Sequence, residues 1–86
     1  MYKVKYHKQV LKFLQSQPKK IKKMIIESFE VIKENPFNNN VDIKPLKGFK
    51  NFYRLRIGKF RIIFEIEKEE LIIYVISAGS RGDIYK

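Results

Sequence analysis

The first 35 residues have a strand pattern followed by two helix patterns. Tyr2, Val4 and Tyr6 alternate with lysines, which is the two-residue period of a strand with one buried face. Apolar residues then recur at three- and four-residue spacing, which predicts two helices. Their expected core stripes are Tyr6, Val10, Phe13 and Leu14 in the first helix, and Ile21, Met24, Ile25, Phe29 and Ile32 in the second. Pro18 suits the start of the second helix and Asn35-Pro36 its end, so we expect a helical hairpin.

The second half of the chain has the pattern of a β-sheet. Residues 37–51 are rich in Asn, Pro and Gly, and we expect a connecting loop anchored by a short apolar segment around Val41 and Ile43. Residues 52–57 and 60–67 have strand patterns separated by Gly58-Lys59, a two-residue hairpin turn. Residues 71–78 are almost continuously apolar, which predicts a strand covered on both faces. The expected fold is α+β, in the order β-α-α-β-β-β, with a mainly antiparallel sheet packed on the two-helix hairpin.

The two-residue turn fixes the register of the predicted hairpin. It places Arg56 directly opposite Arg61, with Arg54 on the same face. The other face is wholly apolar and should lie against the helices. Its residues are Tyr53, Leu55, Ile57, Phe60, Ile62, Phe64 and Ile66. Opposed like charges on a sheet cost about 0.2 to 1 kcal/mol, and we expect no carboxylate beside these arginines. Guanidinium groups donate paired hydrogen bonds to phosphate, so the cluster predicts an anion site.

The segment after the last predicted strand extends this site. That strand should pair with residues 60–67, so its end is expected near Arg61, where Arg81 would join the arginines. Tyr85 offers an aromatic ring to a nucleic-acid base.

Composition points to a polyanionic partner. The 86 residues carry a formal net charge of +10, more than solubility requires, and their number limits the chain to one domain, residues 1–86. There is no cysteine, the carboxylates are scattered, and His7 is the only histidine. A two-histidine ribonuclease is therefore excluded, and we expect no metal site and no cofactor. The N-terminus lacks the apolar core of a signal peptide and no run approaches a membrane span, so we expect a cytoplasmic protein.

Four lysines crowd the start of the second predicted helix, where they oppose the helix dipole. They are Lys19, Lys20, Lys22 and Lys23. Such a departure from a local preference often marks a functional surface, so we interpret them as an RNA-facing or partner-facing patch. Plain solvent exposure is the alternative.

The string from Leu46 to Tyr85 resembles the RelE/ParE toxin superfamily. The matching motifs are Leu46-Lys47-Gly48, residues 53–66, and Arg81 to Tyr85, and the preceding strand and helices match the family's element order. The resemblance implies the toxin of a type II toxin-antitoxin system. It is either a ribosome-dependent mRNA endoribonuclease of RelE type or, as the alternative, a DNA gyrase inhibitor of ParE type without catalytic activity. Arg61, Arg81 and Tyr85 favour the RelE type.

The RelE resemblance also implies roles for individual residues. Cleavage would be metal-independent, with the 2′-hydroxyl attacking the adjacent phosphate. Arg61 and Arg81 would stabilise the charged transition state, Arg81 would also serve the leaving 5′-oxygen, and Tyr85 would stack on the nucleotide. Arg54 and Arg56 stand where such enzymes place a basic pair that includes the lysine proposed as general base.

An arginine at that place stays protonated and is a poor proton acceptor, so the general base is left open. Lys47 and Lys50 lie just upstream and are candidates for this role and for RNA contacts. The implied partners are an acidic, RelB-like antitoxin, mRNA on the ribosome, and ribosomal RNA. A basic nucleic-acid-binding module that cleaves nothing is a third hypothesis.

Overall fold

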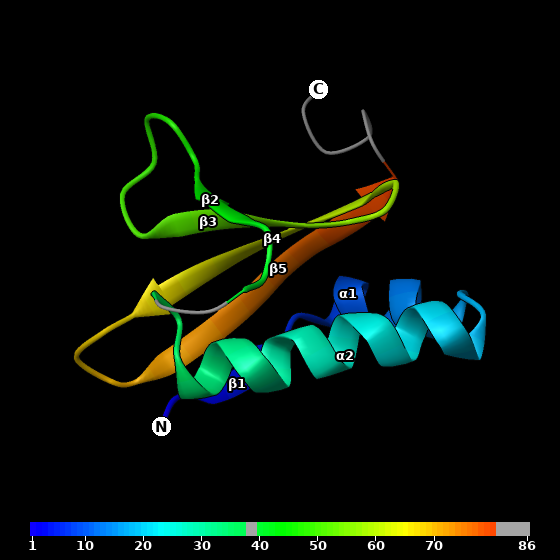
Figure 1. Cartoon of the computed structure of the whole chain (residues 1–86), viewed down its shortest axis with the longest axis horizontal. Coiled ribbons are helices and arrows are strands. Elements are labelled where there is room, and N and C mark those ends of the chain that lie inside the picture. Colours follow the sequence, from blue (N-terminus) through cyan, green and yellow to red (C-terminus); the bar gives the residue numbers. More distant parts are fainter. Residues whose placement is uncertain (38–39, 81–86) are drawn as a thin grey trace.

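The computed structural model describes residues 1–37 and 40–80, which form a five-stranded sheet with two helices on one face (Figure 1). The elements are β1 (Lys3–Tyr6), α1 (Lys8–Gln15), α2 (Lys19–Glu34), β2 (Ile43–Pro45), β3 (Phe52–Ile57), β4 (Phe60–Glu67) and β5 (Ile72–Ser80). The strand order is β1-β5-β4-β3-β2. Only the β1–β5 pair within this described sheet is parallel, so the expected α+β fold with a mainly antiparallel sheet is confirmed.

The segment expected to be a connecting loop contains an additional strand. Ile43–Pro45 forms β2, which pairs with β3 so that Ile43 lies opposite Leu55. A three-residue strand has little room for a two-residue period, and its proline argues against a strand everywhere except at an edge of a sheet. The predicted order therefore gains one short edge strand.

The helix limits follow the local chemistry of the chain. His7 precedes α1 in extended conformation, and its Nδ1 accepts a hydrogen bond from the Gln9 backbone N–H at 3.1 Å. Pro18 immediately precedes α2 and Asn35 ends it, as expected. The first turn of α2 has no acidic residue and no side-chain cap, so its stability depends on packing rather than on its own N-terminus. Among the described residues, no helix is long and apolar enough to cross a membrane.

The hairpin of β3 and β4 has the predicted register. Gly58 has a φ of 55°, a left-handed conformation that glycine adopts without steric cost, and Ile57 pairs with Phe60 across the turn. The neighbouring β5 departs from expectation. Ile73 and Val75 are buried, but Ile72 and Tyr74 are only half-buried, because the helices cover one face of the sheet and not the other.

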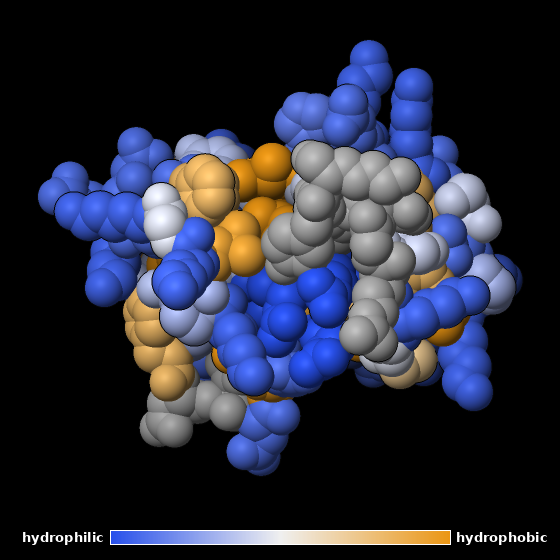
Figure 2. Space-filling model, turned by 90° about the horizontal axis from the view of Figure 1, so that it is seen from above, coloured by the Kyte–Doolittle hydropathy of each residue, from blue (hydrophilic) through white to orange (hydrophobic). Residues whose placement is uncertain are grey.

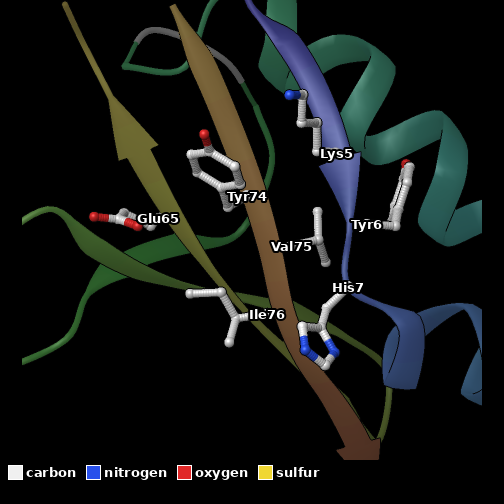
Figure 3. A pocket seen from close by; sticks show the side chains of 7 residues that line it. All are labelled: Lys5, Tyr6, His7, Glu65, Tyr74, Val75 and Ile76. Atoms are coloured by element: carbon white, nitrogen blue, oxygen red, sulfur yellow. The ribbon is translucent and has the colours of Figure 1, made fainter. Parts of the chain in front are cut away.

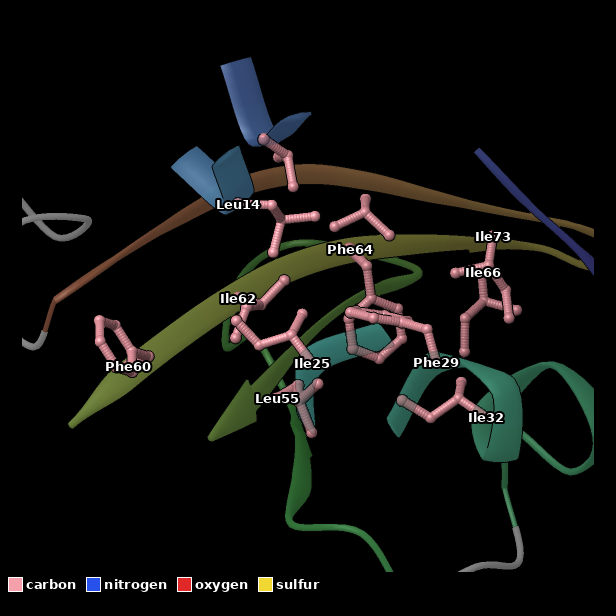
Figure 4. Packing of buried hydrophobic residues seen from close by; sticks show 12 residues of the cluster. Leu14, Ile25, Phe29, Ile32, Leu55, Phe60, Ile62, Phe64, Ile66 and Ile73 are labelled. Atoms are coloured by element: carbon pink, nitrogen blue, oxygen red, sulfur yellow. The ribbon is translucent and has the colours of Figure 1, made fainter. Parts of the chain in front are cut away.

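The hydrophobic core lies between the sheet and the helices, with Phe29 of α2 at its centre (Figure 4). The Phe29 ring meets Phe64 edge-on at 5.3 Å between centroids and Tyr6 edge-on at 6.0 Å. Ile25 and Ile32 lie on the same buried stripe of α2. Met24 was expected on this stripe, but 42% of it is exposed. It stands at the margin, one residue and about 100° of helical rotation from Ile25.

Replacing Phe29 with alanine should lower the free energy of unfolding by about 3 to 5 kcal/mol, because the cavity would open between α2 and β4. Urea unfolding measures the change. Val31→Ala is the matched control: Val31 is exposed on the same helix, and its loss should change stability by no more than about 0.5 kcal/mol. Equal losses for the two variants would contradict this placement of the core.

Candidate functional site

The arginines lie on the face of the sheet that points away from the helices. Arg56 pairs with Arg61 and Arg54 with Ile63, while the intervening Leu55 is fully buried in the core. Figure 2 views the molecule from this side and shows strongly hydrophilic side chains gathered near the centre of the face. The register confirms that Arg54, Arg56 and Arg61 share one face. We call these three residues the arginine cluster.

Asp42 contradicts the expectation that no carboxylate lies beside the arginines. Its backbone carbonyl accepts a hydrogen bond from the Arg56 N–H at 3.0 Å, which extends the β2–β3 register by one pair. The side chain therefore lies across from Arg56. Its Oδ2 accepts a hydrogen bond from Arg56 Nε at 3.2 Å, and its Oδ1 lies 3.8 Å from Arg54 Nη2. Because the sequence pattern did not predict β2, it gave no reason to expect Asp42 beside the arginine cluster.

Lys44 is a second residue that the sequence pattern does not place here. It pairs with Arg54 across β2 and β3, so the two side chains share the outer face, and Lys44 is exposed. Two rows of residues therefore cross the sheet on this face. The first is Asp42, Arg56, Arg61 and Gly79, and the second is Lys44, Arg54, Ile63 and Ser77. In the sequence, the one sign of strand β2 is that the apolar residues Val41 and Ile43 alternate with Asp42.

Arg54 is more enclosed than Arg56. Only 12% of its side chain is exposed. Among the residues that the structure describes, its Nε and Nη2 atoms are buried and have no hydrogen-bond partner. Buried donors that lack an acceptor are costly, and a charged donor most of all. An anion bound between Arg54 and Arg56 would supply the missing acceptors.

An aromatic pair adjoins the cluster on the same face. Phe52 precedes Arg54 by two residues on β3, so their side chains point the same way. The ring of Phe49 lies 6.3 Å from that of Phe52, and 65% of Phe49 is exposed. Exposed rings beside cations are typical of surfaces that bind single-stranded nucleic acid.

The other sequence-predicted residues lie apart from the arginine pair. Lys47 and Lys50 are exposed in the β2–β3 connection, at the end of β3 opposite the Gly58-Lys59 turn (Figure 1). The structure therefore does not bring them to Arg56 and Arg61. The four lysines of α2 belong to the helix layer, on the other side of the sheet, where Lys19, Lys22 and Lys23 line a shallow hollow with Ile26 and Glu27. Lys20 is also exposed.

Arg81 and Tyr85 lie outside the described residues. The strand that leads to them is placed as predicted, because Gly79 pairs with Arg61 and Ser80 with Phe60. β5 therefore ends beside the arginine cluster.

The opposite end of the outer face is acidic. Glu65 pairs with Tyr74, and both line a hollow of about 320 Å³ near the end of β1 (Figure 3). Partial burial, together with the carboxylates of Glu70, Glu65 and Glu67, raises the pKa of Tyr74. The charge on this face thus changes sign along β4, from Arg61 to Glu65. A phosphate group would be attracted to the arginine end and repelled from the other.

A family model described as the ParE toxin of a type II toxin-antitoxin system matches residues 4–85. The chain belongs to this family. It is 38% identical over 86 residues to a putative toxin RelE1 of Methanocaldococcus jannaschii, across 99% of this chain and 96% of that protein. It is also 38% identical over 74 residues to toxin RelE3 of the same organism, across 81% and 82% of the two chains.

Solved structures of RelE toxins are also similar to this chain. The RelE-RelB complex from Pyrococcus horikoshii includes a chain with a TM-score of 0.83 and 32% identity, with 95% of this chain and 97% of that chain covered. The isolated E. coli RelE toxin has a TM-score of 0.80 at 16% identity, with 99% of this chain and 89% of that chain covered. At this low identity the similarity supports only the shared fold. These relatives favour the RelE branch of the superfamily over the ParE branch.

Tyr6, the last residue of β1, gives a prediction about stability at alkaline pH. Burial of the hydroxyl, with a smaller effect of Glu30, raises the pKa of Tyr6 to about 12 from 10.0. The contribution of the Tyr6 hydroxyl to the free energy of unfolding is complete below pH 10 and is lost as the pH rises toward 12. The reason is that the unfolded chain releases the hydroxyl proton at a lower pH than the folded chain does. Tyr6→Phe should therefore lose less stability than the parent between pH 9 and pH 11.5, measured as the urea midpoint.

Tyr2→Phe is the control for this comparison, since it removes a hydroxyl just before the same strand and leaves Tyr6 in place. If Tyr6→Phe and the parent lose stability equally over this pH range, the hydroxyl is not held in a buried environment.

Proposed function

We propose that this chain is a toxin that acts in the cytoplasm and cleaves mRNA on the ribosome, by attack of a 2′-hydroxyl on the adjacent phosphate without a metal ion. The observation that carries the proposal is the arginine cluster on an open sheet face, with Arg54 donors that lack acceptors within the described structure. Membership of a toxin family and the similarity to RelE toxins support the toxin role.

Arg56 and Arg61 would hold the scissile phosphate between them. Residues directly opposite on antiparallel strands have Cβ atoms about 4.5 to 5.5 Å apart, so two guanidinium groups can reach one phosphate. Negative charge builds on the phosphate oxygens as the 2′-oxygen bonds to phosphorus and the bond to the 5′-oxygen breaks. Fixed cations aimed at that charge lower the barrier without acting as bases. The 2′-hydroxyl proton would pass to water and the leaving 5′-oxygen would take a proton from water, so that the products carry a 2′,3′-cyclic phosphate and a 5′-hydroxyl.

The RNA strand would follow β3 across the outer face. Phe49 and Phe52 would stack on bases beside the reacting phosphate, and Lys47 and Lys50 would contact phosphates farther along the strand. The sequence resemblance adds Arg81 at the leaving oxygen and Tyr85 on the nucleotide. In this arrangement Lys47 and Lys50 bind RNA and do not take part in proton transfer.

The lysines at the start of α2 would contact ribosomal RNA. They lie in the helix layer, whereas the arginine cluster lies on the far face of the sheet. The two surfaces can therefore be occupied together, one by the ribosome and one by mRNA. Because the contacts are with phosphates, this binding should weaken steeply with salt.

An acidic antitoxin of RelB type would hold the toxin inactive. The similar chains from P. horikoshii and M. jannaschii were solved as complexes of RelE with RelB, which supports a partner of this kind. Leu11, Met24 and Val31 are exposed apolar residues on the helices, and they offer anchors that charge alone would not supply.

Inducing the gene and mapping new 5′ ends of mRNA should show cuts within translated codons. The cuts should disappear when translation initiation is blocked, because cleavage is proposed to occur on the ribosome. Intact mRNA together with broken chromosomal DNA would instead indicate a gyrase inhibitor.

Arg61→Ala and Arg81→Ala should each abolish growth arrest and lower the cleavage rate at least about a hundredfold, as expected for loss of a group that stabilises transition-state charge. Lys12→Ala removes an exposed positive charge from α1 and should leave toxicity unchanged. The melting temperature of Arg61→Ala should stay the same or rise, because a like-charge neighbour of Arg56 is removed. A clearly lower melting temperature would mean that Arg61 serves the fold and not the reaction.

A further inference from the structure

The carboxylate of Asp42 lies where the arginine cluster would accept a phosphate. It contacts Arg56 through Oδ2 and approaches Arg54 through Oδ1, so one anionic group spans both guanidinium groups. The backbone bond from the Arg56 N–H to the Asp42 carbonyl holds this residue directly across from Arg56. Arg56 therefore has a carboxylate on one side and Arg61 on the other.

We propose that Asp42 is an internal competitor of the RNA phosphate that binds Arg54 and Arg56, next to the scissile phosphate held between Arg56 and Arg61: it occupies Arg54 and Arg56 in the free toxin and must leave them when RNA binds. The inference rests on the proposed function for the identity of the ligand. Its physical basis, exchange of one anion for another at the same two arginines, is independent of cleavage.

The contacts are weak enough for this exchange. The Arg56 hydrogen bond is long at 3.2 Å, and the 3.8 Å separation from Arg54 is beyond hydrogen-bonding distance. The side chains of Asp42 and Arg56 are 46% and 38% exposed, so water screens the contact between them. A phosphate can accept paired, charge-assisted bonds from each guanidinium, which this carboxylate does not. Phosphate is therefore the stronger ligand.

The exchange needs little movement of the chain. The backbone of Asp42 is anchored to Arg56 and continues into β2, so only rotation of a short side chain is required to vacate the site. In the absence of RNA, the same carboxylate lowers the repulsion among the arginines. Asp42 should therefore stabilise the free protein and weaken RNA binding.

Asp42→Asn tests the proposal, since the amide keeps the shape of the side chain and loses its charge. The full chain is made by chemical synthesis, because a nuclease that cleaves mRNA on the ribosome would stop its own translation, and the ligand is a short single-stranded RNA with a 2′-O-methyl group at every position, so that it binds without cleavage. Fluorescence anisotropy should show binding about two- to fivefold tighter than that of the parent. The plot of log affinity against log salt concentration should also steepen, by less than about 0.7.

Glu67→Gln is the matched control. Glu67 is acidic and belongs to β4 like Arg61, but it lies at the acidic end of the sheet, next to Ile72 and away from the arginines. It should show a smaller gain in affinity than Asp42→Asn. Weaker binding by Asp42→Asn would overturn the proposal, because it would show that the carboxylate orients the arginines for RNA. Unchanged binding would also overturn it, because it would show that the carboxylate does not compete with RNA.

A second measurement uses inorganic phosphate in place of RNA. Without phosphate, Asp42→Asn should melt about 1 to 5 °C below the parent, and added phosphate should raise its melting temperature more than that of the parent. Equal protection of the two proteins would overturn the competitor role even if RNA cleavage is established. Greater protection of Asp42→Asn together with an absence of RNA cleavage would support Asp42 as the competitor and contradict the proposed function.

Discussion

The register of the β3–β4 hairpin is the constraint on which the other features depend. One set of alternating residues supplies core side chains such as Leu55, Ile62 and Phe64, and the other set supplies the arginine cluster. A shift of one residue would turn the core side chains toward water and the arginines toward the helices. The cost of burying three charged side chains among the apolar residues of the helices would be prohibitive. The hydrophobic core and the anion site are therefore fixed by the same pairing, and neither can be rearranged alone.

The helices complete this division of the molecule. The helices cover one face of the sheet and leave the other open. The chain belongs to a family of toxins, and the target of a toxin has to reach its functional surface. The open face meets this requirement. The outer face is not uniformly basic. Arg61 and Glu65 on the same strand give it a gradient of charge, which would orient an extended polyanion as well as attract it.

The features that could be predicted from the sequence are those with short-range causes. Gly58-Lys59 specifies a two-residue turn, and from that turn the period of two places Arg56 across from Arg61. Asp42 and Lys44 could not be placed, because β2 is ordered by pairing with β3 and has almost no pattern of its own. Burial of β5 was overestimated because an apolar run shows that a strand is hydrophobic but not how many of its faces are covered. Met24 shows the same limit at the margin of a helical stripe.

The position of β5 has a consequence for how the chain folds. It pairs on one side with β4, its neighbour in sequence, and on the other with β1, where Lys3 meets Ile72. The hairpins close over short loops, whereas the parallel β1–β5 pair closes a loop of nearly the whole chain and must overcome the greater loss of entropy. During synthesis, β1 has no partner within the described sheet until β5 leaves the ribosome. The sheet that presents the arginines is thus completed only after β5 has been synthesised, so chains that stop before β5 lack the complete sheet.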